Sequence, residues 1–186
     1  MKQAELSRDE IRRGEMSVGD LVLAGLLVAL GLVLHGVFPG IVGGMKPDFS
    51  LIMLFIAIMV IPDRKVAVVT GLATAIITAM TTTFPMGQIP NIVDKFVTTA
   101  LVLGMTAVLP RKVLVPAVGA VGTLVSGTVF LGTAAIIADL PTSFISLFAT
   151  VVLPAAGINT AALLVLYPLA AKLYSMQAVR GLRTAR

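Results

Sequence analysis

The sequence predicts an all-α fold: a bundle of six transmembrane helices with both ends of the chain in the cytoplasm. Of the 186 residues, 58% are hydrophobic and only 12% are charged, and the mean hydropathy is +1.03. Soluble domains carry about 25% charged residues. The apolar residues fall into runs close to the length of about 20 residues that crosses a bilayer core. The basic residues lie in short clusters between these runs.

The net charge of +5 and the isoelectric point near 10.0 do not indicate a nucleic-acid-binding protein. Such proteins gather Lys and Arg on one polar face, whereas here the basic clusters alternate with apolar runs. We therefore expect the lipid bilayer, and no nucleic acid, as a partner.

Each apolar run begins or ends at residues that stop a membrane helix. Ser17-Val-Gly-Asp20 resembles a capping box before the first run. Proline and basic residues at 62–65 and 110–112 close the second and fourth runs, Pro and Gly between 84 and 90 close the third, and Asp139-Leu-Pro141 closes the fifth. We expect the spans at residues 18–38, 49–61, 66–83, 92–109, 113–138 and 144–174.

Two of these spans have unusual lengths. The second is short, and the sixth is too long for one straight crossing and contains Pro154. Because proline kinks or interrupts helices, we expect a kink or break at residues 154–157.

The distribution of basic residues predicts the orientation. Twelve of the fourteen Lys and Arg residues fall in the two ends of the chain and in the turns 62–65 and 110–112, whereas only Lys46 and Lys95 lie on the other side. Cytoplasmic loops carry the excess of Lys and Arg, so both ends are predicted to lie inside the cell. The chain divides into a cytoplasmic segment, a six-helix membrane domain and a basic cytoplasmic tail, at residues 1–17, 18–174 and 175–186.

No pattern of catalytic or cofactor-binding residues is present. With no cysteine and a single histidine, the chain lacks the usual ligands of a dedicated metal site. No nucleotide-binding loop and no Ser/His/Asp arrangement appears. We expect neither an enzyme nor an ATPase, and no cofactor or metal.

The three outer connections, at residues 39–48, 81–91 and 139–143, combine Gly and Pro with polar side chains. Non-helical backbone at membrane depth is tolerated where it is buried in protein or lines a cavity. We interpret the three segments as the cover of a pocket, with ordinary Gly/Pro turns as the alternative.

A polar stripe opens the fourth span. Asn91, Asp94, Lys95 and Thr98 have the spacing of one helix face. Asp94 and Lys95 project about 100° apart, so we expect each to pair with another group rather than with its neighbour. Ionisable residues in a membrane helix indicate function. The alternative is an interface position, with Asp94 in the first turn favoured by the helix dipole and Lys95 reaching outward.

Further polar groups lie near the same outer level. Lys46 and Asp48 form a second pair of opposite charge, and Gln88 and Asn91 add amides, a set that suits a zwitterionic substrate. We interpret the lone His35 as a hydrogen-bonded structural residue rather than a ligand or proton relay. Asn159 could bond a neighbouring helix or the substrate, and both interpretations stay open.

Small residues recur at four-residue spacing, which lets helix backbones approach closely. We interpret them as packing within the bundle, with a docking surface for another membrane subunit as the alternative. They are Ala67, Gly71, Ala75 and Ala79 in the third span, Gly25 and Ala29 in the first, and Gly119, Thr123 and Gly127 in the fifth.

Four motifs resemble the bacterial tryptophan transporter family. They are Gly43-Gly-Met-Lys-Pro-Asp-Phe49, Thr81-Thr-Thr-Phe-Pro-Met-Gly-Gln-Ile-Pro-Asn-Ile-Val-Asp-Lys95, Leu153-Pro-Ala-Ala-Gly-Ile-Asn-Thr160 and Tyr167-Pro168. The resemblance covers about residues 18–174. That family is in turn similar to the substrate-binding (S) components of energy-coupling-factor transporters, which have six helices, cytoplasmic ends and a ligand site under the outer loops.

The resemblance implies uptake of tryptophan as part of a complex with a transmembrane coupling subunit and two ATPase subunits. It implies that one set of residues binds the ammonium and carboxylate of the substrate and another binds the indole. The first set is Lys46, Asp48, Gln88, Asn91, Asp94 and Lys95, and the second is Phe84 and Met86.

Three other functions stay open. The chain could be a stand-alone proton-coupled amino-acid transporter with Asp94 as its proton site, an S component for a vitamin, or a membrane scaffold that binds no small solute.

Overall fold

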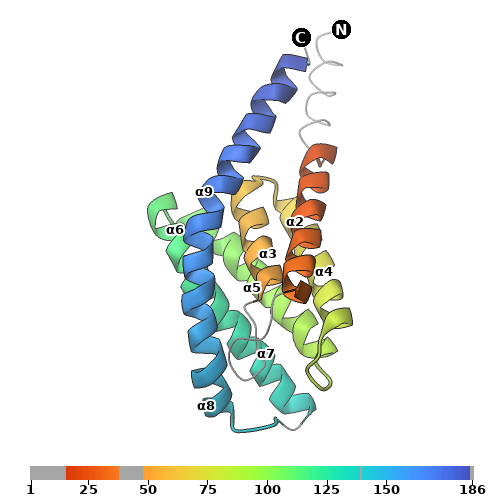
Figure 1. The fold of residues 1–186 in the computed structure, drawn as a ribbon, viewed down its shortest axis with the longest axis vertical. Coiled ribbons are helices and arrows are strands. Elements are labelled where there is room, and N and C mark those ends of the chain that lie inside the picture. The colour runs from red at the N-terminus through yellow and green to blue at the C-terminus, as the bar shows by residue number, and fades with distance from the viewer. Residues whose placement is uncertain (1–15, 38–47, 139, 185–186) are drawn as a thin grey trace.

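The computed structural model of the chain describes residues 16–37, 48–138 and 140–184, which form helices joined by turns. Figure 1 shows the helices packed side by side, with the start of α2 and the end of α9 at the same end of the molecule. The elements are α2 (Val18–Val37), α3 (Phe49–Val60), α4 (Arg64–Thr81), α5 (Gln88–Val108), α6 (Arg111–Ala117), the π-helical turn η1 (Val118–Gly122), α7 (Thr123–Ile137), α8 (Phe144–Leu147), the π-helical turn η2 (Phe148–Val152) and α9 (Leu153–Thr184).

These elements make six helices, because two groups run on without interruption. The elements α6, η1 and α7 form one helix over Arg111–Ile137, and α8, η2 and α9 form another that starts at Phe144. Five of the six are long and apolar enough to cross a membrane, and α3 is the shorter exception. The predicted six-helix bundle is confirmed for the part of the chain that the structure describes. The cytoplasmic placement of its ends stays a prediction.

The short helix α3 lies inside the bundle. Its 12 residues span about 18 Å at 1.5 Å per residue, less than the roughly 30 Å of a bilayer core. Every residue from Ser50 to Ile58 is buried, with α2, α4, α5 and α9 packed around it. Because other helices cover it, α3 is apolar on all sides, as a fully buried helix requires.

Of the kink or break predicted at residues 154–157, the break is wrong. The helix continues from Phe144 to Thr184, and Pro154 is the second residue of α9, directly after the π-helical turn η2. A proline ring collides with the carbonyl four residues earlier, which here belongs to Thr150 within η2. A wider π-helical turn at that point lets the helix continue past the proline. A second such turn, η1, follows Pro116.

Helix α5 begins earlier than predicted, at Gln88 instead of residue 92. A tight turn precedes it, in which the Gly87 amide donates to the Phe84 carbonyl (3.0 Å) and Met86 has a positive φ of 55°. A Cβ on Gly87 would lie 2.5 Å from Thr82 Oγ1, so only glycine fits. The earlier start places Asp94 in the second turn of α5, away from the helix end.

Small residues bring α4 against α5 and α7 against the last helix. A Cβ on Gly71 would lie 2.4 Å from Thr99 Oγ1, and one on Gly119 would lie 2.7 Å from the Thr160 backbone. Packing within the bundle is therefore confirmed for these stripes. It is wrong for α2, where Gly25 and Ala29 are exposed and a Cβ on Gly25 would meet nothing within 4 Å.

Candidate binding site

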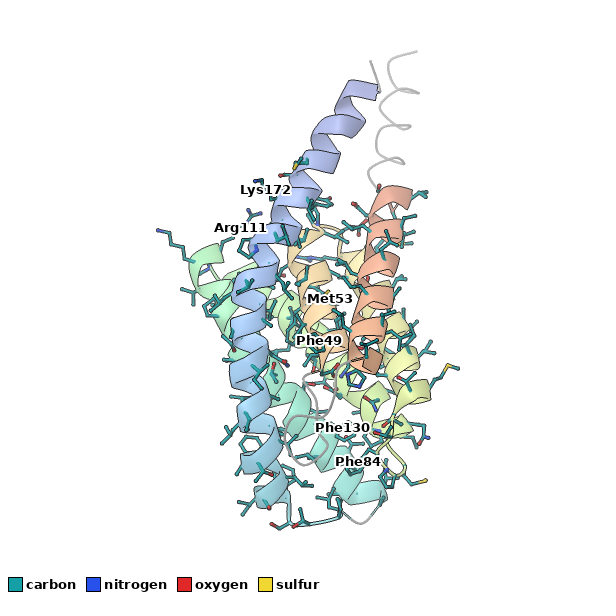
Figure 2. All side chains as sticks on the ribbon, viewed as in Figure 1. Phe49, Met53, Phe84, Arg111, Phe130 and Lys172 are labelled. Carbon is teal, nitrogen blue, oxygen red and sulfur yellow. The ribbon has the colours of Figure 1, made fainter. Side chains whose placement is uncertain are left out.

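A cavity of about 280 Å³ lies between α3, α4 and α5 on one side and α7 and the last helix on the other. It lies toward the end of the bundle that carries Phe84 and Phe130, away from Arg111 and Lys172 (Figure 2). Six predicted site residues line it, namely Asp48, Phe84, Asn91, Asp94, Lys95 and Asn159. Of the connections predicted to cover a pocket, the second contributes residues 81–84 and Asn91 to the cavity and the first contributes Asp48. Residues 140–143 of the third do not line it, and residues 39–47 and Asp139 lie outside the described residues.

Three charged side chains meet on the α3–α5 wall of this cavity. The Lys95 ammonium donates to Asp48 Oδ2 at 3.2 Å and to Asp94 Oδ2 at 2.5 Å. Thr98 Oγ1 donates to the other oxygen of Asp94 at 2.9 Å. Two carboxylates and one ammonium give this group a formal charge of −1. We call Asp48, Asp94 and Lys95 the charged cluster.

The structure corrects two expectations about Asp94 and Lys95. They pair with each other, because the flexible four-carbon stem of lysine can fold back across the 100° between neighbouring positions. They are not interface residues, because each is only 1% exposed. Burying charge is costly unless it is paired and hydrogen-bonded, and here each member has at least two polar partners.

Asp48 joins the cluster from the start of α3, where it is the N-cap. Its Oδ1 accepts the Leu51 amide at 3.0 Å while Oδ2 accepts from Lys95. Since one oxygen holds the helix start, the other is held toward the cavity by backbone geometry rather than by side-chain packing alone.

His35, on α2, lines the cavity beside Asp48. Its Nδ1 is 4.0 Å from Asp48 Oδ1, a distance for charge attraction but not for a hydrogen bond. That nitrogen is buried and has no hydrogen-bond partner among the described residues. The interpretation of His35 as a hydrogen-bonded structural residue is therefore wrong for Nδ1.

The opposite wall is uncharged and comes from α7 and the last helix. Asn159 Nδ2 donates to Thr123 Oγ1 at 3.2 Å, and both residues are buried. Of the two interpretations of Asn159, the bond to a neighbouring helix is confirmed. Ser126 lines the same wall one turn along α7.

The outer part of the cavity is aromatic and apolar. Phe84, from the turn before α5, meets Phe130 of α7 edge-to-face, with ring centroids 5.3 Å apart and planes at 81°. Leu131, Leu147 and Val151 extend this apolar surface. The cavity is thus polar around the charged cluster and aromatic near the turn at residues 84–87.

Two described residues of the predicted site, Met86 and Gln88, do not line the cavity. Met86 is exposed because its left-handed backbone turns the side chain away from the bundle. Gln88 is also exposed, at the start of α5, and Lys46 lies outside the described residues. Asn91 lines the cavity but uses Nδ2 to donate to the Gly87 carbonyl at 2.8 Å, which secures the turn.

The sequence interpretation missed Thr78, Thr123, Ser126 and Phe130, all of which line the cavity. A signal existed on α4, where Thr70, Thr74 and Thr78 recur every four residues. The Thr74 and Thr78 hydroxyls each donate to the carbonyl four residues earlier, so these threonines tolerate burial in an apolar helix. For Phe130, the sequence holds no signal, because its relation to Phe84 depends on the packing of α7.

A second cavity of about 270 Å³ lies at the opposite end of the bundle, beside Asp63, Arg64, Arg111 and Tyr167. Within the described ranges, no group of three or more His, Asp or Glu side chains is placed to hold a metal ion. The cavity with the charged cluster is therefore the stronger candidate for a ligand, since it alone combines buried charge with an aromatic surface.

Comparison with known proteins agrees with this geometry. The sequence model of the family described as "Tryptophan transporter TrpP" matches residues 17–175. A "Probable tryptophan transport protein" of Bacillus subtilis (strain 168) is 45% identical over 157 residues, covering 83% of this chain and 91% of the relative. A protein of the same description from Clostridium acetobutylicum is 47% identical over 150 residues, covering 77% of this chain and 86% of the relative. No solved structure matches.

These matches confirm the resemblance predicted from the loop motifs. Proteins of this family are transporters and not enzymes, and several helices here are long and apolar enough to span a membrane. The molecule is a multi-pass protein of the bacterial plasma membrane.

Proposed function

This chain belongs to the tryptophan transporter family, and from that premise we propose that it binds tryptophan in the cavity beside the charged cluster and delivers it for uptake. The observation that carries the proposal is the pairing, in one cavity, of a buried cluster of charge −1 with an edge-to-face aromatic pair. A zwitterion with a flat apolar side chain complements both.

The charge of the cluster favours a substrate with an ammonium group. Asp48 and Asp94 share one cation, Lys95, so a second cation near them would neutralise the cluster. Lysine has three N–H donors, and the two carboxylates use two of them. In the proposal the third faces the substrate carboxylate. Each charge-assisted hydrogen bond of this kind contributes about 1.5–3 kcal/mol.

The aromatic end of the cavity would hold the indole. Aromatic rings pair favourably edge-to-face or offset, with a gain of about 0.5–1.5 kcal/mol beyond the area they bury. Phe84 and Phe130 present such faces and edges, and Leu131, Leu147 and Val151 add apolar contact. This role extends the sequence interpretation of Phe84 and replaces Met86 with Phe130.

For the energy source, we propose that the chain acts as the S component of an energy-coupling-factor transporter, docked on a coupling subunit that carries two ATPases. The similarity to S components that the sequence resemblance implies for its family supports this role, and so does the lack of a nucleotide-binding motif in the sequence. So does the surface of α2, where the small residues Gly25 and Ala29 are exposed and would let another membrane helix approach closely. A proton-coupled mechanism is less well supported, because Asp94 is already engaged by Lys95 and Thr98.

Ligand fluorescence tests the binding step directly. The chain contains no Trp, so the indole emission of added tryptophan is free of protein tryptophan signal. We expect saturable binding to the purified protein, with a blue shift of the tryptophan emission as the indole leaves water. Analogues of tryptophan should compete with it in calorimetry. Binding of a vitamin in place of tryptophan, or of no solute in a panel of amino acids and vitamins, would refute the proposed substrate.

A further inference from the structure

Two buried side-chain atoms of residues that line the cavity have no hydrogen-bond partner among the described residues. One is His35 Nδ1, which lies beside Asp48 of the charged cluster, and the other is Asn159 Oδ1, on the uncharged wall. Asn159 is fully buried, and while its Nδ2 donates to Thr123 Oγ1, its Oδ1 has no partner among the described residues. Buried polar atoms are paired in the great majority of cases, and an unpaired acceptor at a cavity wall calls for a donor from a ligand. Thr99 Oγ1 is also unpaired, but it packs against Gly71 between α4 and α5 and does not line the cavity.

The packing of the two helices holds Asn159 in place. On one side of the Asn159–Thr123 bond, Gly119 brings η1 against Thr160, and on the other side Gly127 brings α7 against Val152. Because both contacts leave no room for even a Cβ, the two helices cannot approach more closely to give Oδ1 another partner. The Thr123 bond uses one of the two N–H groups of Nδ2 and fixes the orientation of the amide, and it leaves Oδ1 as an acceptor without a partner.

The hydrogen-bonding groups of tryptophan select one match for this acceptor. A zwitterionic tryptophan has two donor groups, the ammonium and the indole N–H, whereas its carboxylate only accepts. The ammonium is drawn to the two carboxylates of the charged cluster on the other wall. The indole N–H is then the donor that remains for an uncharged amide oxygen.

We infer that Asn159 is a specificity-determining residue whose Oδ1 accepts the indole N–H of tryptophan. The inference rests on the proposed function, since it requires tryptophan to occupy the cavity. Its consequence is selectivity: a site built to bond a polar group rejects an analogue that lacks it, because the buried partner is left unpaired. Apolar surroundings alone would not separate tryptophan from an analogue of the same shape.

The test compares tryptophan with 3-benzothienylalanine, in which sulfur replaces the indole N–H in a ring of nearly the same shape. Calorimetry on the purified wild-type protein is expected to show tryptophan binding at least tenfold more tightly, although the sulfur ring is the more apolar. Asn159→Leu replaces the amide with an apolar side chain of similar size. In this variant the ratio of the two affinities should fall to within about threefold. Thr99→Val, which removes the other unpaired buried oxygen, should keep the wild-type ratio.

The outcomes separate this inference from the proposed function. Equal affinity of the wild-type protein for the two ligands, or an unchanged ratio in a folded Asn159→Leu, would overturn the role of Asn159 while tryptophan binding itself stands. Binding of neither ligand by the wild-type protein would overturn both. The ratio of the wild-type affinities for tryptophan and 3-benzothienylalanine requires no variant. It therefore tests whether the indole N–H is recognised even where Asn159→Leu does not fold.

Discussion

Lys95 Nζ lies 3.2 Å from Oδ2 of Asp48, a residue 47 positions earlier in the chain. This bond ties the second turn of α5 to the N-cap of α3, and it leaves Asp94 and Asp48 on either side of one ammonium. The charged cluster is therefore a single unit, and a change in one member alters the environment of the other two.

Asp94→Asn keeps the shape of the side chain and removes one negative charge from the cluster. We expect tryptophan affinity to fall by about tenfold to a hundredfold, because a charge-assisted bond is worth about 1.5–3 kcal/mol and each decade corresponds to about 1.4 kcal/mol. Calorimetry on the purified variant measures this. Asp20→Asn is the control, since it removes a carboxylate that accepts from Tyr174 far from the cavity. Wild-type affinity in Asp94→Asn would assign the cluster a purely structural role.

Lys95→Met tests how much the shared cation of the charged cluster contributes to stability. Removing the cation leaves the buried Asp94 and the partly buried Asp48 without their shared partner, and breaking a buried ion pair costs about 3–5 kcal/mol. We expect a clearly lower melting temperature in a fixed detergent. The double variant Asp94→Asn with Lys95→Met should recover part of the loss, because it leaves only Asp48 charged. No difference in stability between the single and double variants would show that the two residues are not energetically coupled.

Gly71→Leu should destabilise the bundle by about 1–3 kcal/mol, the usual range for overpacking, because a Cβ at this position already collides with Thr99. Gly104→Leu is the matched control on α5, where a Cβ would meet nothing within 4 Å. Thermal unfolding of both variants in the same detergent gives the comparison. Equal melting temperatures would contradict the close α4–α5 packing.

Single cysteines report the orientation, since the chain has none of its own. From the basic-residue distribution we expect Ser7→Cys to resist an impermeant thiol reagent added outside the cell, and Thr142→Cys, in the exposed turn before α8, to react. The same reagent should label Ser7→Cys after the membrane is permeabilised. Labelling of Ser7→Cys in intact cells would reverse the predicted topology.

Gly25→Leu on the exposed side of α2 should separate binding from transport. If that surface docks a coupling subunit, the added side chain should abolish uptake and leave the affinity for tryptophan within about twofold of wild type. Val22→Leu, also exposed on α2, is the control with little change in size. Uptake should also disappear in a host that lacks all coupling and ATPase subunits. Full accumulation there would support the proton-coupled alternative.

Much of the fold could be predicted because hydropathy and helix-stopping residues are local properties. The six apolar runs and the turns at residues 62–65 and 110–112 agree with the observed helices. The predictions of helix ends and breaks were wrong where residues nearby in the structure determine the local backbone. Pro154 does not break its helix because a π-helical turn precedes it, and α5 starts earlier because Gly87 leaves room for a tight turn in which a Cβ would collide with Thr82.

From the sequence alone, helical spacing placed Asp94, Lys95 and Thr98 on one helix face, and the cost of charge in a membrane made Asp94 and Lys95 candidates for a binding site. Only the tertiary structure decided their partners. The bond from Lys95 to Asp48, the contact of Phe84 with Phe130, and the bond from Asn159 to Thr123 each join residues far apart in the chain. No local pattern encodes such contacts, because they depend on how helices that are distant in the sequence pack against one another.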